Sequence, residues 1–223
     1  MSKQKPLIAL NLKAYAESSG ERGLKLCETA SEVSMLTGVR IVVCPDATLL
    51  SKAAERGADV FAQGVEGREP GPFTGALTAL MLKEAGAKGS LLNHSERRIP
   101  ADAIKSAIDA LHSNGLESML CTRDIRESAQ YSVFKPTYIA IEPPELIGSG
   151  ISVSTAKPEV VRGAVQSIRQ YAPDVRVICG AGISNAADVK KAVELGAEGV
   201  LLASAYVRSK DPRKLLMDMA GQL

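Results

Sequence analysis

Residues Val175–Ala203 read VRVICGAGISNAADVKKAVELGAEGVLLA. Two short apolar runs at the ends of this stretch enclose a segment, Ala186–Leu195, whose apolar residues recur with helical spacing. A residue that can cap a helix precedes the segment, either Ser184 or Asn185, and Gly196 follows it. The stretch therefore predicts a strand, a helix and a second strand.

The same alternation continues through the rest of the chain. The apolar runs are almost continuous rather than interleaved with polar residues, which is typical of strands covered on both faces. Segments with helical spacing, such as Ala101–His112 and Pro158–Tyr171, lie between most of them. The runs that we interpret as strands are Leu7–Leu10, Val39–Cys44, Val60–Gln63, Ser90–Asn93, Ser118–Cys121, Tyr138–Ile141, Val175–Cys179 and Gly199–Ala203.

Eight strand–helix units without a composition break or a long linker predict an α/β fold, a single (β/α)8 barrel formed by residues 1–223. A doubly wound open sheet is the alternative. The chain is shorter than the roughly 250 residues usual for such a barrel, so some helices should be short or missing. A barrel with short or missing helices leaves more apolar surface exposed, which favours oligomerisation.

Composition argues against several classes of partner. The net charge is +2 with both signs interspersed, which indicates neither a nucleic-acid nor a membrane-surface partner. No apolar run approaches the length of a transmembrane helix, and the one near the N-terminus is too short for a signal peptide. The cysteines are far apart, which disfavours a disulfide framework or a zinc site. We expect a soluble, cytoplasmic protein without metal or cofactor. Of its cysteines, Cys27, Cys44, Cys121 and Cys179, the two that end apolar runs, Cys44 and Cys179, are expected to be buried, reduced thiols.

The stretch Tyr138–Gly150 reads YIAIEPPELIGSG. Its apolar run ends in Glu142, and that carboxylate opens a loop stiffened by two prolines and ended by Gly148 and Gly150. A strand end holds a side chain in one place, whereas a loop of this kind can swing as a lid. A fixed base beside a closing lid indicates proton chemistry on a small substrate that is shielded from water. The alternative is a strand followed by an ordinary turn.

Two other predicted strands end in residues with useful chemistry. Asn11 and Lys13 follow the first strand, and they share a side if the strand persists. Lys13 could stabilise an anion, form a Schiff base or remain a solvated surface lysine. His94 ends the fourth strand, where Ser95 can start a helical turn whose dipole favours a neutral imidazole; a capping or packing histidine is the alternative. His112 is expected to lie at the C-terminal end of its helix, where it complements the helix dipole.

Small residues follow the seventh and eighth predicted strands, at 180–182 and at 203–204. Small side chains let backbone N–H groups approach a phosphate at a helix N-terminus, a frequent arrangement after these two strands of a barrel. A tight strand–helix turn explains either segment alone, but the pair favours a phosphate site. Gly148 and Ser149 could add N–H donors when the lid closes.

Taken together, these positions resemble the triosephosphate isomerase family. The matching motifs follow the family's order and spacing from the first predicted strand to the eighth, so the resemblance covers essentially the whole chain. The lid and the His-Ser-Glu-Arg-Arg segment are the most specific of them. The motifs are Asn11-x-Lys13, Gly71-Pro72-Phe73-Thr74-Gly75, His94-Ser95-Glu96-Arg97-Arg98, and Glu142-Pro143 followed by Ile147-Gly148-Ser149-Gly150.

The resemblance implies a TIM barrel that interconverts dihydroxyacetone phosphate and D-glyceraldehyde 3-phosphate through an enediolate, in glycolysis and gluconeogenesis. By this resemblance Glu142 is the base and His94 is the neutral electrophile. Lys13 stabilises the developing charge, Asn11 hydrogen-bonds near the same oxygens, and Glu96 holds Lys13 in place. The positions that match the family's phosphate-binding or substrate-binding residues are Asn11, Lys13, Ile147, Gly148, Gly182, Ala203 and Ser204.

The chain also departs from the common form of the family. Its lid reads Pro-Glu-Leu at 144–146 where the common form has a tryptophan, and the chain has no tryptophan. Residues 122–124 replace the usual x-Gly-Glu, and Gly182 replaces a frequent serine. These features and the short length resemble the compact archaeal branch. The loop Glu66–Gly75 resembles one that inserts into a neighbouring subunit, so a homodimer or homotetramer is expected.

Two other functions remain open at this point. One is another phosphate-binding barrel enzyme, such as an aldolase that uses Lys13 as a Schiff base, which requires a lysine desolvated enough to be neutral. The other is a non-catalytic sugar-phosphate-binding barrel. It predicts ligand binding without turnover, and it leaves Glu142 and His94 without a role.

Overall fold

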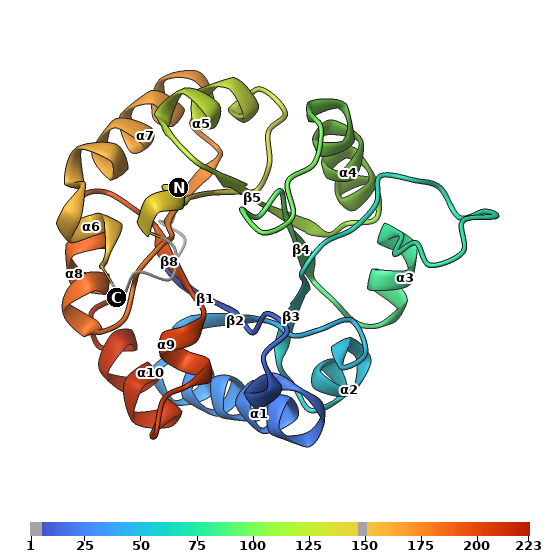
Figure 1. Ribbon diagram of the computed structural model, residues 1–223, viewed down its shortest axis with the longest axis horizontal. Helices are drawn as coiled ribbons and strands as arrows, with labels where there is room; N and C mark the ends of the chain where they lie inside the picture. Colours follow the sequence, from blue (N-terminus) through green and yellow to red (C-terminus); the bar gives the residue numbers. More distant parts are fainter. Residues whose placement is uncertain (1–5, 147–150) are drawn as a thin grey trace.

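The computed structural model describes residues 6–146 and 151–223. Eight parallel strands pair in sequence order, and the first also pairs with the last, so the sheet closes into a barrel surrounded by helices (Figure 1). The closure confirms the predicted barrel and excludes the doubly wound open sheet. The strands are β1 (Leu7–Asn11), β2 (Arg40–Cys44), β3 (Asp59–Ala62), β4 (Gly89–Leu92), β5 (Glu117–Thr122), β6 (Tyr138–Ile141), β7 (Arg176–Cys179) and β8 (Gly199–Leu202).

The helices explain how a short chain completes this barrel. The second and third α-helices have only six residues each, as the length of the chain predicts. Asn185 caps one of the longer helices, because its side chain accepts a hydrogen bond from the N–H of Asp188 at 3.1 Å. The helices are η1 (Ala16–Ser18), α1 (Gly20–Thr37), α2 (Leu50–Glu55), α3 (Ala79–Glu84), α4 (Ala101–Ser113), α5 (Ile125–Ser132), η2 (Pro144–Leu146), α6 (Val153–Ala156), α7 (Pro158–Tyr171), α8 (Ala186–Glu194), α9 (Ser204–Val207) and α10 (Pro212–Ala220).

The strands separate two apolar layers. One set of side chains, with Phe61 and Met119 among them, fills the inside of the barrel, and a larger set packs between strands and helices. A Cβ placed on Gly89 would lie 2.7 Å from Cζ of Phe61, so the glycine leaves room for that ring. Burial of both strand faces is the reason for the nearly continuous apolar runs in the sequence.

Charged residues close the barrel at the end where the strands begin. Arg40 donates from Nε to Asp59 at 2.7 Å and from Nη1 to Glu117 at 2.9 Å. The hydroxyl of Tyr138 donates to the same Glu117 oxygen at 2.9 Å and accepts from Arg176 at 3.3 Å. Burial, followed by the neighbouring Glu117 carboxylate, raises the pKa of Tyr138 to about 12. These five residues, each the first of its strand, are called the entry network below.

The thiols are all buried, as predicted for the two that end apolar runs. Cys44, Cys121 and Cys179 lie in strands, and Cys27 lies on the inner face of α1. Burial raises the pKa of Cys27 to about 12 and raises the pKa of each strand thiol further.

No helix of the described part of the chain is long and apolar enough to cross a membrane.

Candidate active site

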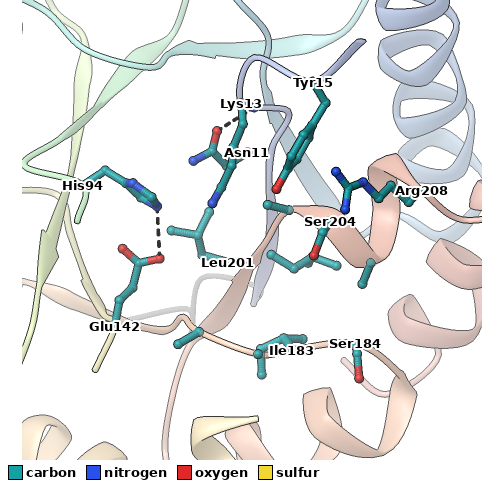
Figure 2. Close-up of a pocket in the computed structure, with 15 residues that line it drawn as sticks. Asn11, Lys13, Tyr15, His94, Glu142, Ile183, Ser184, Leu201, Ser204 and Arg208 are labelled. Carbon is teal, nitrogen blue, oxygen red and sulfur yellow. Dashed lines mark hydrogen bonds and ion pairs between the residues drawn. The ribbon is translucent and has the colours of Figure 1, made fainter. Parts of the chain in front are cut away.

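A cavity of about 420 Å³ opens at the ends of the strands opposite the entry network (Figure 2). It brings together every predicted site residue that the structure describes except Glu96, which reaches the cavity through Lys13. Two predicted residues of the lid, Ile147 and Gly148, lie outside the described residues. The cavity is lined by Asn11, Lys13, Tyr15, His94, Glu142, Ala181, Gly182, Ile183, Ser184, Leu201, Leu202, Ala203, Ser204, Ala205 and Arg208.

Glu142 follows the last residue of β6, and the barrel fixes its backbone. Its N–H donates to the carbonyl of Thr122 at 2.7 Å, and the residue is only 4% exposed. A Cβ at Gly180 would lie 2.5 Å from Cγ of Glu142. The side chain of Glu142 therefore fits against the end of β7 only because residue 180 is a glycine. Oε2 of Glu142 is buried and has no hydrogen-bond partner within residues 6–146 and 151–223. An unsatisfied buried carboxylate oxygen is costly, and it is available to accept a proton.

His94 faces this carboxylate across the cavity. Its Nε2 lies 3.7 Å from Oε1 of Glu142, and the residue is 7% exposed. The backbone N–H of Glu96 donates to Nδ1 at 3.2 Å. Nδ1 is the acceptor in this contact, which fits a ring with its proton on Nε2, pointing into the site; a carboxylate oxygen of Glu96 also lies 3.6 Å from Nδ1.

The turn predicted after His94 forms, but it does not continue into a helix. The segment forms one turn, closed by the bond from Arg97 N–H to the His94 carbonyl at 2.8 Å, and the helix begins only at α4. The reason is Asn93, which adopts a left-handed conformation with φ 57° and accepts from the N–H of Ile99 at 3.1 Å. A backbone donor, not the N-terminus of a helix, therefore faces Nδ1 of His94.

Lys13 is turned toward the cavity by its neighbours. Its backbone is left-handed, with φ 52°, a strained state for a residue with a side chain. Oδ1 of Asn11 accepts from the Lys13 N–H at 3.0 Å, and the amide of Gln63 donates to the Lys13 carbonyl at 2.9 Å. The ammonium group forms an ion pair with Glu96 at 2.6 Å. These contacts position one cation beside the facing pair of His94 and Glu142.

The other end of the cavity has the small residues that the sequence predicts for a phosphate. Gly182 has φ 71°, and a Cβ there would lie 1.9 Å from the carbonyl oxygen of Ile151. No other residue fits this position without moving the chain. β8 ends at Leu202, one residue earlier than predicted, Ala203 follows it, and Ser204 begins α9. Small residues therefore leave the backbone accessible at this end of the cavity, both after β7 and after β8.

Sequence reasoning missed two residues at that end, Tyr15 and Arg208. The guanidinium of Arg208 lies 4.6 Å from the centre of the Tyr15 ring, and its Nε is 3.6 Å from Glu17. One signal was present, because Ser204 and Arg208 are four residues apart and share a face of a helical turn. His112 lies away from the cavity, at the end of α4, where its Nε2 is 3.0 Å from Oγ of Ser118.

The comparisons with known proteins agree with this geometry. The family model for triosephosphate isomerase matches residues 6–220 of the chain. The chain belongs to the triosephosphate isomerase family. The triosephosphate isomerase of Methanothermus fervidus is 46% identical to it, over 98% of this chain and 99% of the relative. That of Methanocaldococcus jannaschii is 44% identical, over 96% of this chain and 98% of the relative.

Membership of the triosephosphate isomerase family confirms the predicted family and makes the chain an isomerase. The relatives are mostly archaeal and the chain covers nearly their whole length, which confirms the resemblance to a compact branch. A crystal structure of triosephosphate isomerase from Bartonella henselae superposes with a TM-score of 0.78, over 98% of this chain and 99% of that one. At 20% identity, that likeness concerns the fold alone.

Proposed function

We propose that this family member interconverts dihydroxyacetone phosphate and D-glyceraldehyde 3-phosphate through an enediolate, as a step of glycolysis and gluconeogenesis. The proposal rests on one observation above all, the buried carboxylate of Glu142 that faces the imidazole of His94 at 3.7 Å. A carboxylate whose Oε2 has no hydrogen-bond partner among the described residues and a ring with a proton to donate are the two groups that enolisation next to a carbonyl requires.

The two groups act on neighbouring atoms of the substrate. Glu142 takes the proton from the carbon beside the carbonyl, and the electron pair of that bond moves to form the enediolate. His94 donates a hydrogen bond from Nε2 to the oxygen on which negative charge develops, and it passes protons between the two oxygens. Return of the proton from Glu142 to the other carbon completes the isomerisation. General acid–base help of this kind contributes about 10²–10⁴-fold.

Lys13 and Asn11 serve the same oxygens. The ammonium group of Lys13 stabilises the negative charge of the enediolate, and Glu96 keeps this group in place through the 2.6 Å ion pair. Asn11 fixes the backbone of Lys13 with its Oδ1, which leaves its amide N–H groups to bind substrate.

The phosphate group occupies the end of the cavity beside Gly182, Ala203 and Ser204. The open backbone at these positions, described above, supports this assignment. Ile147 and Gly148 add to the phosphate site from the lid by the family resemblance. The lid excludes water, since an enediolate exposed to water can eliminate its phosphate.

A coupled assay of the purified protein with D-glyceraldehyde 3-phosphate tests the reaction and its base together. Glu142→Gln should lower kcat by about 10³-fold or more, because the amide cannot accept the proton. Glu159→Gln, an equal change of charge at an exposed position of α7, is the matched control and should retain full activity. Activity of Glu142→Gln within tenfold of the unchanged protein would contradict the assignment.

The rival functions predict other results. An aldolase would need a neutral, desolvated amine to form a Schiff base, whereas Nζ of Lys13 forms an ion pair with Glu96 at 2.6 Å. Borohydride added with dihydroxyacetone phosphate should therefore leave the activity unchanged, whereas a Schiff base would be reduced and the enzyme inactivated. A non-catalytic barrel would bind inorganic phosphate and show no turnover.

We also propose that two or four copies of this one-domain chain associate through the loop Glu66–Gly75. The loop between β3 and α3 projects from the barrel (Figure 1), and residues 68–75 are all exposed. Its base is anchored, because Glu66 pairs with Thr78 and a Cβ at Gly67 would lie 2.3 Å from the backbone of α4. Deletion of 68–75 should reduce the molar mass in light scattering to that of a monomer; an unchanged mass would contradict this proposal.

The cytoplasm is the compartment we propose, since it holds the triose phosphates and keeps thiols reduced. The four buried cysteines without a disulfide support this. Fractionation of the source cells with an activity assay would test it.

A further inference from the structure

The charges that line the cavity do not balance for a dianionic substrate if only the residues assigned so far are counted. Of the described lining residues, Lys13, Glu142 and Arg208 carry formal charge. The charge of Lys13 is offset by the carboxylate of Glu96 at 2.6 Å. The catalytic carboxylate of Glu142 is then left to repel the phosphate group.

Arg208 lies where it can correct this imbalance. It is four residues after Ser204, and its backbone N–H donates to the Ser204 carbonyl at 2.9 Å, so the two residues are one helical turn apart on the same face of α9. Figure 2 shows its guanidinium beside the ring of Tyr15, on the same side of the cavity as Ser204 and far from His94 and Glu142. The cation is therefore at the phosphate end of the site.

The guanidinium of Arg208 is held in position, but some of its N–H groups remain accessible to an anion. The face of the Tyr15 ring supports it at 4.6 Å from the ring centre. Nε approaches Glu17 at 3.6 Å, which is an ion pair without hydrogen-bond geometry. The side chain of Arg208 is 58% exposed and that of Glu17 is 46% exposed, so an incoming anion can reach the other guanidinium nitrogens from solvent.

We propose that Arg208 is a further phosphate-binding residue of the site, positioned by Tyr15 and competed for by Glu17. This inference rests on the proposed function. A planar guanidinium binds phosphate oxygens with two parallel N–H groups, which a lysine cannot reproduce. It also attracts a charged substrate to the cavity before contact, and that attraction weakens with salt.

Kinetics of Arg208→Ala test the proposal. KM for D-glyceraldehyde 3-phosphate and the inhibition constant of inorganic phosphate should each rise about tenfold, with kcat changed much less, because a charge-assisted contact to the phosphate is lost. Turnover of glyceraldehyde, which lacks the phosphate, should be unaffected. The KM and the inhibition constant of Arg208→Lys should lie between those of the unchanged protein and those of Arg208→Ala. The salt dependence of kcat/KM should be weaker in Arg208→Ala than in the unchanged protein.

Two further variants test whether the effect is specific to the position of Arg208 and to its competition with Glu17. Arg213→Ala removes the same charge from an exposed position of α10 and should behave as the unchanged protein. Glu17→Gln removes the competitor and should lower the inhibition constant of phosphate, an effect opposite in sign to that of Arg208→Ala. Equal losses with glyceraldehyde and its phosphate, or a KM within twofold of the unchanged protein, would overturn the assignment. Absence of turnover in the unchanged protein would instead overturn the proposed reaction.

Discussion

Both mouths of the barrel contain charged residues, but the two mouths differ in how these charges are paired. In the entry network, the carboxylates of Asp59 and Glu117 each bind the guanidinium of Arg40, and the hydroxyl of Tyr138 completes the contacts. At the other mouth, Oε2 of Glu142 has no hydrogen-bond partner within the described residues, and Oε1 lies 3.7 Å from Nε2 of His94. One oxygen of Asp59 likewise has no partner there, but its carboxylate is paired with Arg40 at 2.7 Å, whereas no lysine or arginine of the described part of the chain forms an ion pair with Glu142.

The difference shows what each mouth contributes. Paired charges hold strands together, while an unpaired carboxylate costs stability and gains reactivity. The entry network and the catalytic cavity lie at opposite ends of the same parallel strands. The end that carries the destabilising carboxylate is therefore supported by eight strands whose other ends are held by the entry network. This separation can be tested by substitutions that act on one mouth only.

The largest effect is expected at the entry network. Arg40→Met should lower the free energy of unfolding by roughly 3 kcal/mol, because Asp59 and Glu117 lose the cation that compensates them. kcat should change little. Urea unfolding followed by circular dichroism measures the first, and the coupled assay measures the second. Arg56→Met is the control: its ion pairs with Glu21 and Glu28 are exposed, and it should have little effect on either.

The next effect is expected at the catalytic mouth. Gly180→Ala would place a methyl group 2.5 Å from Cγ of Glu142 and displace the carboxylate. kcat should fall by about 100-fold, roughly 2.7 kcal/mol in the activation barrier, with the fold retained. Gly221→Ala is the control, since a Cβ there meets nothing closer than 3.5 Å. Full activity of Gly180→Ala would show that this glycine does not position the base.

A smaller effect is expected for the charge that supports Lys13. Glu96→Gln weakens the 2.6 Å ion pair but keeps the backbone N–H that donates to His94. We expect kcat/KM to fall about tenfold, roughly 1.4 kcal/mol. Activity of Glu96→Gln equal to that of the unchanged protein would mean that Lys13 does not depend on this carboxylate.

The smallest effect concerns His112, outside both mouths. Burial lowers its pKa from the usual 6.5, so below that pH the unfolded chain takes up a proton before the folded one does. Stability from this residue is therefore complete above about pH 6.5 and is lost as the pH falls through the lower, folded-state pKa. His112→Gln should flatten the fall in stability between about pH 7 and about pH 5 by a fraction of a kcal/mol. Identical pH profiles of the two proteins would contradict this.

The sequence predicted the strands closely because their signal is local. The run Tyr138–Ile141 is β6 as predicted, and Val39–Cys44 differs from β2 by one residue. Burial on both faces of a barrel strand leaves a continuous apolar run with polar ends, which needs no tertiary information to recognise. The ends of those runs also gave Asn11, Lys13, His94 and Glu142, since side chains at strand ends point to one mouth.

Residues whose roles depend on the path of a loop were not predictable in this way. The segment after Ser95 has the composition of a helix start, but the left-handed turn at Asn93 diverts it. Arg208 and Tyr15 meet because the end of α9 and the segment after β1, far apart in the sequence, lie side by side. Gly180 looked like part of a phosphate turn, and the structure shows that it also makes room for Glu142.

The buried cysteines give this protein an internal probe of its own opening. A thiol-specific reagent attacks the thiolate, which is scarce at neutral pH when burial raises the pKa as it does for Cys27. Modification therefore requires an opening of the structure, and its rate measures how often that opening occurs. Cys27 reports on the detachment of α1, while Cys44, Cys121 and Cys179 report on separation of the strands. Peptide mapping of partly modified protein would thus rank the stability of the outer helix against that of the barrel without any introduced label.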